Sequence, residues 1–131
     1  MKPQQLDVEY CIENKEFVNG LLEKRGGWQE GDWYHWDTGY ATGVQLVGRF
    51  ECQALTENED GYGIQGLIWL PTVGDVLGML EATGIESVVV FKAPVSEGYM
   101  AGYSRPREPT YYGPTRLIAL LELLKTVEGK R

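Results

Sequence analysis

The segment from Gly26 to Asp37 reads Gly-Gly-Trp-Gln-Glu-Gly-Asp-Trp-Tyr-His-Trp-Asp and holds three of the four tryptophans and the one histidine of this 131-residue chain. Aromatic residues favour strands, and glycines bound this run, so a strand is predicted over 33–36. Asp32, Tyr34 and Trp36 then share one face of the strand, and Trp33, His35 and Asp37 share the other. Both faces are aromatic. One face therefore builds the core, and the other must be covered by a helix, a second subunit or a partner.

The residues before this segment predict a helix over about 15–25. Phe17, Val18, Leu21 and Leu22 recur at helical spacing, Asn14 suits an N-cap, and Gly26 suits a helix stop. Nearer the N-terminus, apolar residues alternate over 6–12, a period that suits a short strand. The same residues also suit the start of a helix.

Beyond the aromatic segment, two extended stretches are predicted over 44–55 and 64–70. Asp60-Gly61 between them supplies the positive φ of a tight reversal, so we expect a β-hairpin. Thr72 and Asp75 have the spacing of a capping box and begin a helix that Gly84 ends.

The last third of the chain contains Ser87–Phe91, a continuous apolar, β-branched run typical of a buried central strand. Residues 98–104 are expected to pair with it as a hairpin arm. Residues 105–113, rich in charge and proline, read as a surface loop. Pro114-Thr115 then opens a final helix with a leucine-rich stripe.

The predicted fold class is α+β, with an antiparallel sheet covered by helices. A strand-strand-helix pattern occurs twice after an N-terminal helix, over 43–83 and 87–127. A length of 131 residues suits a single domain, 1–131.

Net charge restricts the classes of partner. The formal charge is −7, with five basic against fifteen acidic residues over 1–91 and seven against four over 92–131. An acidic chain is a poor general binder of nucleic acid, which needs a basic face.

No apolar run reaches the roughly 18 residues of a membrane span, and the first residues do not resemble a signal peptide. We therefore expect a cytoplasmic protein that is not bound to a membrane.

Cofactor and metal signatures are weak throughout. Cys11 and Cys52 are far apart and form no Cys-x-x-Cys motif, so two free buried thiols are expected, with a disulfide as the alternative. Gly61–Gly66 has the glycine spacing of a dinucleotide-binding turn, but it leads into an apolar strand and not into a helix. No cofactor is therefore predicted.

His35 and Asp37 project from the same strand face and are the candidates for a ligand site. Together with Asp32 they would suit a metal, but two or three such residues without a second histidine do not make a usual site. A histidine hydrogen-bonded to a carboxylate or a carbonyl is the simpler interpretation. The serines lack a nucleophile elbow, so no catalytic residue is assigned.

A basic and aromatic cluster lies near the C-terminal end, at Tyr103, Arg105, Arg107, Tyr111, Tyr112 and Arg116. Its composition suits single-stranded nucleic acid or phosphate, but the acidity of the chain disfavours that partner. Tyrosine and arginine are also common anchors of protein interfaces. A protein contact is therefore the preferred interpretation.

Three motifs carry a resemblance: Gly26–Trp33, the Trp69-Leu-Pro-Thr-Val-Gly-Asp-Val-Leu77 junction, and Gly113-Pro-Thr115 before a leucine-rich helix. With the first two the chain resembles small uncharacterised phage and prophage proteins, and the third resembles the end of the phage ABA sandwich type of domain. The resemblance implies a mobile-element protein that is not an enzyme. It brings no catalytic residues with it.

These observations favour a module that binds another protein, or a second copy of itself as a homodimer, through exposed aromatic residues. The candidate contact residues are Trp28, Trp33, Trp36, Arg105, Arg107, Tyr111 and Tyr112. One alternative is a small enzyme or ligand-binding domain that uses His35, Asp37 and Glu51. Another is an acidic inhibitor that imitates nucleic acid through a negative face over 51–60.

Overall fold

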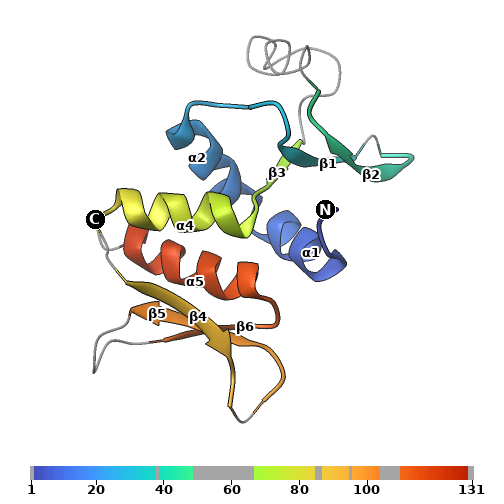
Figure 1. Ribbon diagram of the computed structural model, residues 1–131. Helices are drawn as coiled ribbons and strands as arrows, with labels where there is room; N and C mark the ends of the chain where they lie inside the picture. Colours follow the sequence, from blue (N-terminus) through green and yellow to red (C-terminus); the bar gives the residue numbers. More distant parts are fainter. Residues whose placement is uncertain are drawn as a thin grey trace. The chain divides into compact units, whose positions relative to one another are not determined.

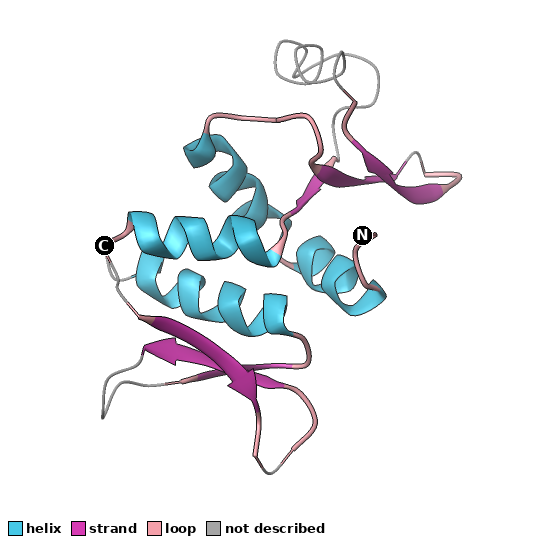
Figure 2. Cartoon of the chain, viewed as in Figure 1, coloured by secondary structure: helices cyan, strands magenta, loops and turns pink. Residues whose placement is uncertain are grey.

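The computed structural model describes residues 2–37, 39–48, 67–84, 87–94, 96–103 and 110–129. These residues form helices and two three-stranded antiparallel sheets, which confirms the α+β class (Figures 1 and 2). The chain divides into two compact units, Met1–Pro71 and Thr72–Arg131. Among the described residues, no helix has the length and apolar character needed to cross a bilayer.

The first unit begins with two helices, α1 (Gln5–Glu13) and α2 (Lys15–Arg25). The helical interpretation of 6–12 is therefore the right one, and α1 buries Val8 and Cys11, three residues apart on one side. Helix α2 has the predicted bounds. Asn14 does not cap it through its side chain, because Nδ2 instead donates to the Tyr10 carbonyl at the end of α1.

Helix α2 ends at Gly26, which adopts φ 108°. Its N–H and that of Gly27 reach back to the carbonyls of Glu23 and Leu22, at 3.1 and 3.0 Å. This left-handed termination is accessible to glycine at little cost and reverses the chain into the tryptophan-rich segment.

Strand β1 (Trp33–Asp37) is the centre of the first sheet, whose order is β2-β1-β3. It pairs antiparallel with β2 (Thr42–Leu46) on one side and with β3 (Ile68–Leu70) on the other. The expected hairpin between 44–55 and 64–70 is wrong for its described parts, because β1 separates them. The Asp60-Gly61 reversal lies outside the described residues. A strand with apolar side chains on both faces is suited to such a central place.

The outer edge of β3 is closed by a side chain from α2. Asn19 Nδ2 donates to the Leu67 carbonyl at 3.1 Å, and Asn19 Oδ1 accepts from the Trp69 N–H at 3.0 Å. The amide thus makes the two hydrogen bonds that a neighbouring strand would make. Helices α1 and α2 both pack against β3.

The second unit begins with α4 (Val73–Ala82), whose predicted capping box is confirmed. Thr72 Oγ1 accepts from the Asp75 N–H at 3.1 Å, and the Asp75 carboxylate accepts from the Thr72 N–H at 2.8 Å. The last helix, α5 (Arg116–Gly129), starts after Thr115, whose Oγ1 accepts from the Ile118 N–H. Both helices therefore begin at a threonine, as their sequences predict.

The second sheet has the order β4-β5-β6, with β4 (Val88–Lys92), β5 (Tyr99–Tyr103) and β6 (Tyr111–Gly113). Helix α5 lies between this sheet and α4 (Figure 1), and seven of its residues from Leu117 to Leu124 are buried. Gly113 allows the close approach, because a Cβ there would lie 2.4 Å from the Ala119 nitrogen. The expectation of an irregular loop over 105–113 is wrong for residues 111–113, because these form β6.

Strand β4 is an edge strand and not the buried central strand that its sequence predicts. The hairpin partner β5 takes the central place, since it pairs with both β4 and β6. Along β4, Val88 and Val90 are half-buried, whereas Val89 and Phe91 are exposed. Burial therefore alternates along β4, because helices cover only one of its faces. The sequence does not show this alternation, since all of its residues from Val88 to Phe91 are apolar.

Candidate functional site

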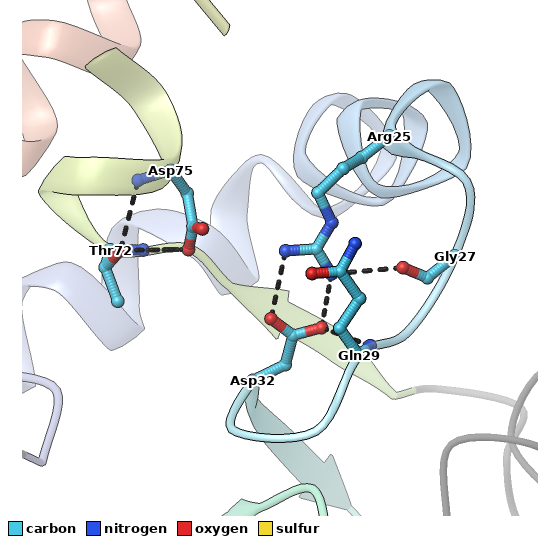
Figure 3. Close-up of polar contacts among 6 residues, drawn as sticks. All are labelled: Arg25, Gly27, Gln29, Asp32, Thr72 and Asp75. Carbon is cyan, nitrogen blue, oxygen red and sulfur yellow. Dashed lines mark hydrogen bonds and ion pairs between the residues drawn. The ribbon is translucent and has the colours of Figure 1, made fainter. Parts of the chain in front are cut away.

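The tryptophan-rich segment is organised around the buried carboxylate of Asp32. The Arg25 guanidinium, at the end of α2, grips both carboxylate oxygens, with Nη1 at 3.0 Å from Oδ1 and a second, shorter contact from Nη2 to Oδ2 (Figure 3). The Gln29 N–H also donates to Oδ2 at 2.7 Å, and Arg25 Nη2 donates to the Gly27 carbonyl at 3.0 Å. One ion pair thus fixes the loop between α2 and β1.

Aromatic rings gather on the side of the first sheet that contains Tyr34. The Trp28 ring meets the Tyr34 ring edge to face, with centroids 5.8 Å apart, and the Arg25 guanidinium carbon lies 4.5 Å from the centroid of the Trp69 ring. Trp69 is completely buried and pairs with Tyr34 across the strands. Trp28 and Trp69 therefore contribute to the interior of the first unit.

Trp36 and Trp33 are both half-buried. Trp36 pairs with Gly43, and its ring occupies the space above that glycine, where an added Cβ would be 2.5 Å from Trp36 Cζ2. Trp33 lies on the opposite face, between Leu46 and Leu70. All three predicted contact tryptophans are thus partly occupied with packing inside the first unit.

His35 and Asp37 share the face predicted for them, but the structure does not join them into a site. His35 is buried between its cross-strand neighbours Val44 and Ile68, and its Nδ1 has no hydrogen-bond partner within the described part of the chain. Asp37 is exposed and accepts from the Gly39 N–H. The predicted hydrogen bond to His35 is not seen at Nδ1. The described residues contain no group of three potential metal ligands.

The remaining predicted residues divide between described and undescribed parts. Arg105, Arg107, Glu51, Cys52 and the whole acidic stretch 51–60 lie outside the described residues. Cys11 is a free thiol, as expected, and burial raises its pKa from 9.0 to about 12, with Asp7 adding to the effect. Tyr111 is half-buried, and Tyr112 is exposed.

Tyr112 belongs to an apolar surface that the sequence did not reveal. We call it the outer face: the side of the β4-β5-β6 sheet turned away from α5, with Val89, Phe91, Met100 and Tyr112. The register places Phe91, Met100 and Tyr112 side by side on three strands, and Val89 lies two residues from Phe91 along β4. Val89, Phe91 and Tyr112 are 38%, 44% and 49% exposed.

Helix α5 covers the other side of this sheet. The close approach of Gly113 to Ala119 is on that side, and Arg116 lies 5.1 Å from the ring centroid of Tyr99, which pairs with Gly113. Since neighbouring residues alternate between the faces, Met100 and Tyr112 must point away from α5. The outer face therefore gains no cover from the helix that buries the core of this unit.

The ring of Tyr112 is held in place before any partner arrives. Its hydroxyl donates to the Glu97 carbonyl, in the turn between β4 and β5, at 2.5 Å. The ring packs against Gly98, where a Cβ would lie 2.7 Å from the hydroxyl oxygen. Fixing a large ring in advance lowers the entropy lost on binding. The exposed Glu97, in the turn beside Tyr112, places a polar residue at the border of the outer face, which is typical of a protein interface.

Comparison of the chain with protein-family models, with curated proteins and with solved structures finds no match. The resemblance to phage proteins therefore stays a prediction from short motifs.

Proposed function

We propose that the protein is a non-enzymatic module that binds another protein through the outer face of its β4-β5-β6 sheet. The observation that carries the proposal is the row Phe91, Met100 and Tyr112, three large side chains aligned on adjacent strands on the face opposite α5. Phe91 and Tyr112 are exposed, and Met100 is half-buried. Contiguous exposed apolar surface with a polar rim marks interaction sites in soluble proteins.

The proposal moves the main contact away from the tryptophans. Trp28, Trp33 and Trp36 are half-buried and engaged in packing within the first unit, whereas Tyr112, from the same set of predicted residues, is 49% exposed. An extended or helical peptide with apolar and aromatic side chains is the ligand that such a surface suits.

A peptide-display selection on the immobilised protein supplies ligands for the test. Burial of a whole Phe side chain is worth about 1.5–3 kcal/mol. Since 44% of Phe91 is exposed, its complete burial by a peptide should add about 1 kcal/mol, or roughly fivefold in Kd. Phe91→Ala should weaken binding by that factor, and Phe91→Ala/Tyr112→Ala by more.

Leu6→Ala is the matched control, because Leu6 is also an exposed apolar residue, at 49%, but lies on α1 in the other unit. It should leave the Kd unchanged. Peptides that ignore Phe91 and Tyr112 but lose affinity in Trp28→Ala or Trp33→Ala variants would place the contact at the tryptophans and reject the outer face.

A further inference from the structure

The edge of β4 is unusual for an exposed strand. On the side away from β5, no described strand pairs with it. The run Val88–Phe91 contains no charge, proline or glycine, and Lys92 is the one charged residue of the strand. Natural sheets usually protect such edges with charges, proline, bulges or a covering element, because the free N–H and C=O groups attract another strand.

Other strand edges in the same chain have features that protect them from pairing with another strand. Along β3, the side chain of Asn19 occupies the Leu67 carbonyl and the Trp69 N–H. Strand β6 is short, with three residues, and β2 carries the polar Thr42 and Gln45 and the glycine at position 43. Strand β4 combines five residues, β-branched side chains and an edge without a described strand neighbour, which are the properties of a strand that pairs with another chain.

We propose that β4 pairs antiparallel with β4 of a second copy, about a two-fold axis through Val90, and joins the two β4-β5-β6 sheets into one sheet of six strands. In this register Val90 faces Val90 of the second copy, and Val89 faces the second copy's Phe91. The pairing is isologous, as a two-fold axis requires, and it uses the full length of β4.

This register also keeps the two outer faces on one side. Residues directly opposite each other in an antiparallel pair project to the same face of the sheet. Val89 faces Phe91 of the second copy, and both residues belong to the outer face of their own sheet. Val89 and Phe91 of both copies therefore lie on the same surface. The row Tyr112, Met100 and Phe91 then continues into Val89 of the second copy. The inference rests on the proposed function in one respect: it makes the protein-binding surface a doubled, two-fold symmetric one.

Charge does not oppose a second copy as the occupant of this edge. Residues 72–131 contain seven Lys and Arg and seven Asp and Glu, so two copies of this unit meet without net repulsion, whereas the whole excess of −7 lies in residues 1–71. Antiparallel pairing places the two Lys92 residues four positions apart, at about 13 Å, where salt screens them. Parallel pairing would place them at about 5 Å.

Cysteine trapping tests the register. In a Cys52→Ser background, Val90→Cys should form a disulfide-linked dimer under mild oxidation, because directly opposed Cα atoms lie about 5 Å apart and a disulfide needs less than about 7 Å. Phe91→Cys is the matched control. Its two copies would be separated by roughly 8 Å along the diagonal and should remain mostly unlinked.

Light scattering after size exclusion should give the wild type a concentration-dependent mass that rises toward twice 14.7 kDa. A wild type that stays monomeric at every concentration overturns the proposal. Preferential linking of Phe91→Cys over Val90→Cys also overturns it, because that result indicates outer faces packed against each other. If the dimer fails while Phe91→Ala still weakens peptide binding, the proposed function survives alone. If the dimer forms and peptides ignore Phe91, only the proposed function is lost.

Discussion

Breaking the ion pair between Arg25 and Asp32 should destabilise the whole tryptophan-rich segment. The Asp32 carboxylate is 8% exposed and accepts from both terminal nitrogens of Arg25 and from the Gln29 N–H. The guanidinium also stacks over Trp69. Helix α2, the loop after it and β3 all meet at this pair, so we expect its loss to affect the first unit as a whole.

The magnitude follows from burial and from the number of hydrogen bonds. Removal of one partner from a buried ion pair costs about 3–5 kcal/mol, because the other charge remains buried without compensation. The Arg25 side chain is 16% exposed, so water reaches it partly. Asp32→Ala should therefore lower the free energy of unfolding by about 3 kcal/mol, the lower end of that range. Arg25→Lys should also destabilise, since lysine keeps the charge but loses the two-pronged geometry and the stacking.

Urea unfolding followed by tryptophan fluorescence is the appropriate assay, because all four tryptophans lie in the first unit. A double-mutant cycle of Arg25→Ala and Asp32→Ala should give a coupling of about 1.5 kcal/mol or more. A coupling below about 0.5 kcal/mol, typical of exposed pairs, would show that this contact does not organise the loop.

Three further predictions concern packing, the β3 edge and the thiol. Gly113→Ala should lower the free energy of unfolding by about 2 kcal/mol, because the added Cβ forces β6 away from the α5 backbone. Gly78→Ala should raise it by about 0.5–1 kcal/mol, because nothing lies within 4 Å of the added Cβ. Urea unfolding followed by circular dichroism measures both changes. Asn19→Leu removes both hydrogen bonds to the β3 edge and should cost about 2 kcal/mol and accelerate hydrogen exchange of the Trp69 amide. The raised pKa of Cys11 means that the folded thiol keeps its proton at a pH where the unfolded thiol ionises. The free energy of unfolding should therefore fall as the pH rises from 9.0 to about 12. The free energy of unfolding of the Cys11→Ala variant should fall less steeply over the same range.

The candidate site was only partly predictable. Tyr112 was among the predicted contact residues, but Val89, Phe91 and Met100 were not. Val89 and Phe91 lie within the run Ser87–Phe91, and a continuous apolar run is ordinarily the sign of a strand buried on both faces. The predicted hairpin itself was the available signal. The strand over 87–91 is expected to pair with 98–104, and a single strongly apolar helix follows. One helix can cover only one face of the hairpin, so the other face stays open.

Local chemistry explains what the sequence determined by itself. The bounds of α2, the capping box at Thr72 and Asp75, the start of α5 after Thr115 and the aromatic strand with two apolar faces all depend on residues within a few positions of each other. Helix caps and side-chain alternation are short-range properties, so they can be read without knowledge of the fold.

The tertiary structure decided the rest. It placed β1 between β2 and β3, closed the β3 edge with an amide from α2 48 to 50 positions away, and engaged the tryptophans in packing. It also put β4 at an edge and left Phe91 and Tyr112 exposed. Which strand edges meet, and which face receives the helix, depends on contacts between distant residues, and the alternation along one strand is the same whichever face is covered.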